Sequence, residues 1–151
     1  MADLVLDAGA LADLLTQCFQ TDDWTKPRVA PSRFISSESS RQINRIVWGH
    51  GPYVVAASTM AFVELVRKCE QIVAGRFEPY QLATFLQDPP DWFVVEPVDE
   101  HLIPLFGQVP MIQSLEWPDA IHVATALSRQ EGCLVTADRV LRQVMGLLEG
   151  R

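Results

Sequence analysis

The sequence predicts an α/β protein, a three-layer α/β/α sandwich with a central, mostly parallel sheet. Three observations support this fold class. Short apolar runs of strand length alternate with longer segments of helical periodicity along the 151 residues. Strands separated by helices need crossover connections, which give a parallel sheet covered on both faces. No internal repeat and no linker divides the chain. We therefore expect one domain over residues 1–151.

The first half of the chain contains two predicted strands. The apolar run Leu4–Leu6 is the first, and an amphipathic helix follows it at about residues 10–19. Residues 21–40 are rich in Asp, Ser and Pro and predict a long loop. A short helix at residues 41–48 ends before a glycine, and residues 53–57 form the second strand.

The second half contributes two further strands. Ser58 or Thr59 caps a helix that runs to about residue 73, and Pro79 lies in the first turn of another helix. Pro104 interrupts residues 99–106, which are therefore helical only briefly. The remaining elements are a strand at 92–95, a helix from Pro118 to about 130, a strand at 133–136 and a helix at 139–148.

Composition limits the class of protein. The chain is 48% apolar and 21% charged, which is typical of a globular domain with a self-sufficient core. Its three cysteines form no CxxC pair, so neither a disulfide framework nor a zinc knuckle is indicated. The N-terminus lacks the features of a signal peptide, and the longest apolar run falls short of the roughly 20 residues that span a bilayer. We expect a soluble, cytoplasmic protein with no membrane partner.

Charge is unevenly distributed along the chain. The net charge of −7 opposes bulk affinity for nucleic acid, because phosphate contacts need Lys and Arg. Residues 26–45, however, hold five basic residues and one acidic residue, a local charge of +4. A basic strip near an acidic centre suits a metal-dependent nuclease, and it equally suits a solvated loop. The arginines of this strip, which are candidates to contact RNA, are Arg28, Arg33, Arg41 and Arg45.

Four acidic residues lie at the ends of predicted core elements. Asp7 and Asp138 follow the first and last strands, and Glu64 and Asp119 lie in the first turns of two helices. Ligands of parallel sheets bind outside the carboxyl ends of the strands, so these acids are expected to converge there. Burying a carboxylate alone costs several kcal/mol, and four together indicate a cation, most simply one or two hard divalent metals.

Each acid also has a simpler interpretation. Asp119 and Asp138 are suited to the N-terminal ends of helices, where carboxylates meet unpaired N–H groups. Taken singly, Glu64 is an exposed helix residue and Asp7 a turn residue that ends a strand. The metal site is favoured by the ordered set of four rather than by any one of them.

The acids lie in the segments VLDAGAL (5–11), STMAFVEL (58–65), DAIHVATAL (119–127) and LVTAD (134–138). In this order the segments resemble those of PIN domains, and most of all the small VapC-type toxin ribonucleases. The resemblance implies an α/β/α fold, a homodimer, Mg²⁺ or Mn²⁺ as cofactor and RNA as substrate. It also implies the toxin half of a type II toxin–antitoxin pair, with a cognate antitoxin that blocks the site.

The chain departs from the family pattern in two places. Ser or Thr often stands two residues after the first aspartate of the family, and this chain has Gly9, which removes a hydroxyl from the acidic cluster. The interval between Asp7 and Glu64 is long, at 57 residues, so the region around residues 20–50 is interpreted as a loop insertion. This insertion bears on substrate choice and on whether the protein is a conventional toxin.

Roles follow for the residues of the predicted site. We assign Asp7 and Asp119 as direct or water-mediated metal ligands, with Asp138 and Glu64 holding metal waters or a second ion. Glu116 either reaches the same helix end or simply starts the helix. Thr136 is either a β-forming residue or a hydroxyl that orients a carboxylate. The nearby His122 is interpreted as a packed helix residue rather than a general base.

Three aromatic residues accompany the basic strip. Trp24, Phe34 and Trp48 either stack on unpaired bases or anchor the loop on the domain, and the same surface also suits a dimer or antitoxin groove. Two functions of another kind remain open beside the toxin ribonuclease: a PIN-fold protein that acts on other nucleic acids, and a non-catalytic module that binds a partner.

Overall fold

The computed structural model describes residues 2–49, 51–67, 76–129 and 131–149. These residues form a four-stranded parallel sheet in the order β3-β2-β1-β4, with seven α-helices around it. The strands are β1 (Leu4–Leu6), β2 (Val55–Ser58), β3 (Phe93–Glu96) and β4 (Cys133–Val135). In register, Val5 pairs with Ala56 of β2 and Leu134 of β4. The predicted α/β/α class is confirmed.

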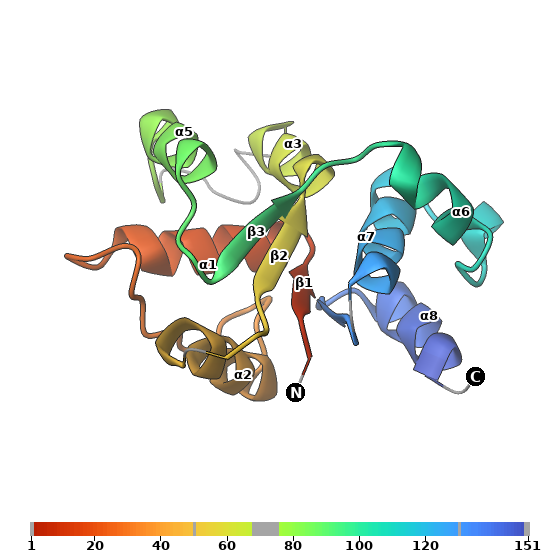
Figure 1. The fold of residues 1–151 in the computed structure, drawn as a ribbon, viewed down its shortest axis with the longest axis horizontal. Helices are drawn as coiled ribbons and strands as arrows, with labels where there is room; N and C mark the ends of the chain where they lie inside the picture. Colours follow the sequence, from red (N-terminus) through yellow and green to blue (C-terminus); the bar gives the residue numbers. More distant parts are fainter. Residues whose placement is uncertain (1, 50, 68–75, 130, 150–151) are drawn as a thin grey trace.

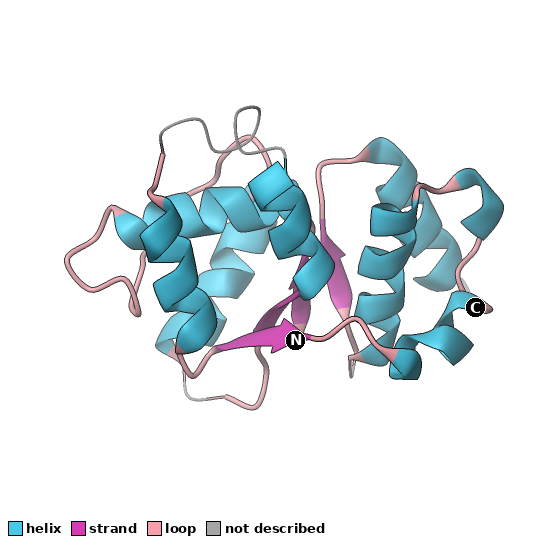
Figure 2. Cartoon of the chain, turned by 90° about the horizontal axis from the view of Figure 1, so that it is seen from above, coloured by secondary structure: helices cyan, strands magenta, loops and turns pink. Residues whose placement is uncertain are grey.

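The helices lie on both sides of the sheet (Figures 1 and 2). On one side are α1 (Ala8–Phe19), α2 (Ser37–Trp48), α3 (Thr59–Arg67) and α5 (Pro79–Gln87). On the other are α6 (Ile103–Phe106), α7 (Trp117–Ser128) and α8 (Arg139–Glu149). Two 3₁₀ helices, Glu100–Leu102 and Ile112–Ser114, flank α6.

The alternating side chains of the strands build two cores, one on each face of the sheet. Leu4 and Leu6 belong to the core beneath α1, α2, α3 and α5, which also contains the fully buried Phe85. Val5 lies between them in sequence and belongs to the other core, beneath α7 and α8. The sheet is therefore covered on both faces, which explains why its strands are apolar except for Ser58 and Glu96, the last residues of β2 and β3.

Most predicted elements match the structure within two or three residues, and three predictions need comment. Helix α2 begins at Ser37, within the predicted loop, because Ser36 caps it by accepting a hydrogen bond from the Ser39 N–H at 3.1 Å. Glu64 is the sixth residue of α3 and so lies in its second turn, not its first. The predicted continuation of α3 to residue 73 lies outside the described residues.

The region predicted as an insertion forms a loop and a helix that pack on the domain. Buried Val29 and Ile35 from the loop and Ile43 from α2 join the core beneath α1. Elsewhere, none of the described helices is both long and apolar enough to span a bilayer.

The turn between α7 and β4 fixes the relative position of two elements that carry predicted site residues. A Cβ atom on Gly132 would lie 2.1 Å from the carbonyl oxygen of Ala126, so the backbone approach requires glycine. We predict that Gly132→Ala lowers the free energy of unfolding by about 1–3 kcal/mol, measured by urea denaturation.

Gly146→Ala is the matched control, because a Cβ atom at this position of α8 meets nothing within 4 Å. It should raise the free energy of unfolding by about 0.5–1 kcal/mol through helix propensity. Equal effects of the two substitutions would contradict the assigned close contact.

Candidate functional site at the carboxyl edge of the sheet

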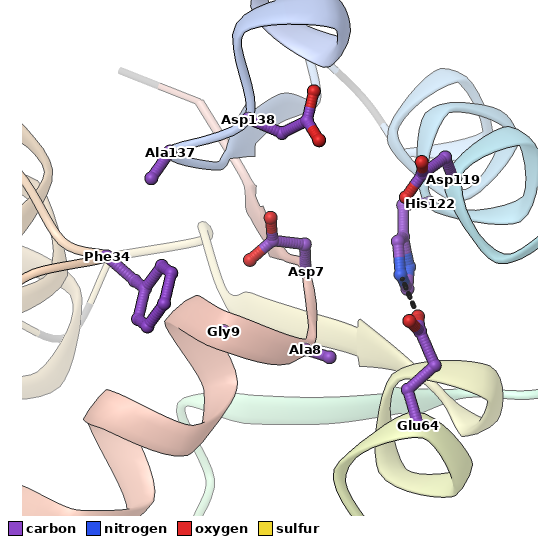
Figure 3. Close-up of a pocket in the computed structure, with 9 residues that line it drawn as sticks. All are labelled: Asp7, Ala8, Gly9, Phe34, Glu64, Asp119, His122, Ala137 and Asp138. Carbon is purple, nitrogen blue, oxygen red and sulfur yellow. Dashed lines mark hydrogen bonds and ion pairs between the residues drawn. The ribbon is translucent and has the colours of Figure 1, made fainter. Parts of the chain in front are cut away.

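A cavity of about 270 Å³, open to solvent, lies at the carboxyl ends of β1 and β4. These two strands form the switch point of the sheet: the chain runs outward from β1 through β2 to β3, then returns to place β4 on the other side of β1. Figure 3 shows the residues that line the cavity: Asp7, Ala8, Gly9, Phe34, Glu64, Asp119, His122, Ala137 and Asp138.

All four acids predicted from the sequence therefore line one cavity. Within the described ranges, no three acidic, histidine or cysteine side chains are arranged to hold one metal ion together. An ion at this site would consequently bind through one or two carboxylates and several water molecules, which is the usual mode for Mg²⁺.

Asp7 joins three elements. Its Oδ1 atom accepts a hydrogen bond from the Ala10 N–H at 2.9 Å and so caps α1, and its Oδ2 atom accepts one from the Thr136 hydroxyl. Its own N–H donates to the Val135 carbonyl at the end of β4. Burial raises the pKa of Asp7 above 3.8, although the two hydrogen bonds and His122 act in the opposite direction.

Thr136 orients two of the acids at once. Its hydroxyl oxygen donates to Asp7 and accepts a hydrogen bond from the Asp138 N–H at 3.0 Å. Asp138 in turn caps α8, because its Oδ1 atom accepts from the N–H groups of Val140 at 2.8 Å and Leu141 at 3.1 Å. The capping interpretation of Asp138 thus holds, and the exposed carboxylate lines the cavity as well.

Asp119 lies in the first turn of α7, behind Pro118. Burial raises its pKa above 3.8, and the charges of Asp138, Glu64 and Glu116 raise it further against the opposing effect of His122. Its carboxylate accepts no hydrogen bond from the described residues. Glu116 is exposed at the N-cap position, and its side chain makes no capping hydrogen bond, so it acts on Asp119 through charge.

His122 is the site residue that sequence reasoning placed in the core without a role. It is packed in α7 with a side chain only 1% exposed, and its Nε2 atom lies 2.7 Å from Oε1 of Glu64 (Figure 3). Its buried Nδ1 atom has no hydrogen-bond partner among the described residues. The sequence contained an indication of this position: residues three apart in a helix share a face, and Asp119 lies three residues before His122.

The basic strip is not gathered in the cavity. Arg33 lies beside the cavity-lining Phe34, with its guanidinium 5.1 Å from the ring centre. The other candidate arginines do not line the cavity: Arg28 stacks on Trp48 at 4.3 Å, Arg41 pairs with Glu38 at 3.0 Å, and Arg45 is exposed.

Two of the three aromatic residues anchor the chain. The Trp24 ring packs on Phe85, with centroids 5.6 Å apart. The Trp48 Nε1 atom donates to the Pro27 carbonyl. Only Phe34 of the three faces the cavity.

Comparison of the chain with protein-family models, with curated proteins and with solved structures gave no significant match.

The raised pKa of Asp7 predicts how stability depends on pH. The folded protein binds this proton more tightly than the unfolded chain, so ionised Asp7 reduces stability as pH rises above about 3.8. Asp7→Asn retains a helix-capping side chain and removes the charge. In EDTA at neutral pH it should raise the unfolding temperature by about 2–4 °C, and the gain should shrink toward pH 4.

Thermal denaturation followed by circular dichroism checks this, with Asp22→Asn, an exposed aspartate, as the control. A lower unfolding temperature for Asp7→Asn at neutral pH would mean that its hydrogen bonds outweigh the cost of its burial.

Proposed function

We propose that this protein is a PIN-like, divalent-metal-dependent endoribonuclease and the toxin component of a type II toxin–antitoxin pair. The observation that carries the proposal is the meeting of Asp7, Glu64, Asp119 and Asp138 at one open cavity, on the edge of the sheet where α/β folds bind ligands. The order and spacing of the PIN-like segments add to it.

The chemistry of the cavity suits Mg²⁺ or Mn²⁺. Its acidic ligands are all carboxylate oxygens, which hard divalent cations prefer. Burial and neighbouring negative charges raise the pKa values of Asp7 and Asp119, and a bound cation would relieve both effects. When bound, such an ion lowers the pKa of a water molecule and neutralises charge that builds on a phosphate.

The residues of the chain have distinct parts in this proposal. Asp7 and Asp119 hold the ion, directly or through water. Thr136 and the N-terminus of α1 fix the Asp7 carboxylate so that it does not rotate when the ion binds. Asp138 and Glu64 would add negative charge around such an ion, and the hydrogen bond with His122 sets the direction of Glu64.

Homodimerisation and an antitoxin partner belong to the same proposal. Large apolar side chains are exposed on α6 and α7, namely Ile103 at 65% and Trp117 at 70%, and Trp117 is two residues before Asp119. The net charge of −7 suits a partner with a basic segment. An adjacent short reading frame that encodes a DNA-binding domain with a basic or apolar tail would support the toxin assignment.

Substitution of the ligands tests the nuclease. We predict that Asp7→Asn and Asp119→Asn each lower the rate of RNA cleavage by about 10²-fold or more, because each removes a charge that holds the ion. Cleavage of a mixed RNA pool would be measured with Mg²⁺, with Mn²⁺ and with EDTA.

The matched control is Asp91→Asn, an exposed aspartate that does not line the cavity, which should cleave at the wild-type rate. Full cleavage by either ligand variant, or undiminished cleavage in EDTA, would refute the assignment. Cleavage of DNA in place of RNA would favour the PIN-fold protein that acts on other nucleic acids.

One observation supports the non-catalytic alternative: no three acidic, histidine or cysteine side chains of the described residues are placed to hold an ion jointly. Metal binding separates the two functions. We predict that Mg²⁺ raises the unfolding temperature of the wild type and leaves that of Asp119→Asn nearly unchanged, since ligands that bind only the folded state stabilise it. No heat of binding in a calorimetric titration and no such stabilisation would favour the partner-binding module.

A further inference from the structure

One wall of the cavity comes from the loop that precedes α2. Phe34 is half-buried there, and among the described residues it is the one phenylalanine, tyrosine or tryptophan that lines the cavity (Figure 3). In that view its ring lies on one side of Asp7, while Asp119, His122 and Glu64 lie on the other. An aromatic surface therefore stands beside the acids that are proposed to hold the ion.

The ring rests against Gly9 of α1. A Cβ atom on Gly9 would lie 2.9 Å from Cδ1 and 3.0 Å from Cγ of Phe34, so any side chain at position 9 would displace the ring. Glycine at position 9 therefore leaves room for the aromatic wall, and the hydroxyl that meets Asp7 comes from Thr136.

The loop that carries Phe34 is fixed by hydrogen bonds to side chains of α1. Asp13 of α1, only 5% exposed, accepts from the Phe34 N–H at 2.9 Å and the Ser32 hydroxyl at 2.5 Å, and pairs with Arg76 at 2.8 Å. Gln17 likewise donates to and accepts from the backbone of Ala30. Phe34 is thus positioned before any ligand arrives, which lowers the ordering cost of binding.

A cation accompanies the ring. Exposed Arg33 lies with its guanidinium over Phe34, 5.1 Å from the ring centre. A nucleobase and a guanidinium both stack on an aromatic face, and an exposed contact of this kind is weak. A base can therefore replace the guanidinium on the Phe34 ring, and Arg33 can then pair with the neighbouring phosphate.

We propose that Phe34 is the base-stacking residue of this site, the side chain on which an unpaired base of the RNA substrate rests. The unpaired base lies on Phe34, and the adjoining phosphate faces the acids of the cavity. In a base-paired helix both faces of each base are covered by neighbouring pairs, so a duplex cannot use this wall. This inference rests on the proposed ribonuclease function.

Kinetics of oligoribonucleotide cleavage test it. Phe34→Leu keeps apolar bulk against Gly9 and removes the π face, and it should lower kcat/KM for a single-stranded octamer by about 5- to 150-fold. Phe34→Tyr should stay within about twofold of the wild type, since it keeps the ring. Tyr80→Leu, which removes an exposed aromatic residue of α5, should have no effect.

An abasic substrate distinguishes stacking from a structural effect. With a ribose–phosphate octamer that lacks bases, wild type and Phe34→Leu should cleave at equal rates. A loss that persists on the abasic octamer would make Phe34 a packing residue and overturn the inference. Equal Mg²⁺-induced shifts in unfolding temperature for the two proteins would show that the acids are undisturbed in the variant.

Photocrosslinking gives a readout that does not depend on turnover. An octamer with 5-iodouridine at each position should form an adduct at Phe34, identified by mass spectrometry. Adducts formed only at other aromatic residues, or equal cleavage of single-stranded and duplex RNA, would overturn the stacking role and leave the nuclease standing. Absence of both cleavage and adducts would refute the nuclease and this inference together.

Discussion

The hydrogen bonds of Asp7 hold together the parts of the fold on which the site depends. Its N–H continues the β1–β4 ladder, one carboxylate oxygen caps α1, and the other receives the Thr136 hydroxyl. These bonds favour the ionised carboxylate, while burial disfavours it, and burial is the larger effect. The protein thus holds the Asp7 carboxylate in one orientation although burial disfavours its charge. Such an arrangement reduces stability where a ligand is expected to restore it, as is common at functional sites.

Helix ends make this concentration of acids tolerable. Asp7 and Asp138 cap α1 and α8, and Asp119 lies in the first turn of α7, so each meets the positive end of a helix dipole. Glu64 has no such position and is instead paired with His122. From the sequence, helix capping and metal binding are competing explanations of a single aspartate. In the structure, the same aspartate can cap a helix and also face the cavity. A carboxylate has two oxygens, and one can cap a helix while the other faces the cavity.

The fold could be predicted because its signals are local. Apolar runs and helical periodicity give the elements, and the rule for parallel sheets brings Asp7 and Asp138 to one edge. What sequence could not supply was pairing between distant residues. The contact of His122 with Glu64 joins residues 58 positions apart, and the partners of Asp13 come from a loop that looked solvated. The start of α2 within that loop could not be predicted for a different reason. A run of serines suits a loop as well as a helix cap, and only the Ser36–Ser39 hydrogen bond decides between them.

The loop before α2 is attached so that substitutions on its outer side need not affect the sheet or the acids. Its backbone is held by side chains of neighbouring helices, Asp13 and Gln17 from α1 and Asn44 from α2, and none of its residues is part of the sheet. The acids of the cavity come from elsewhere in the chain. Residues on the outer side of the loop can therefore be exchanged without altering the strands or the acids. The outer face of this loop is therefore a place where the sequence can change while the sheet and the four acids stay as they are.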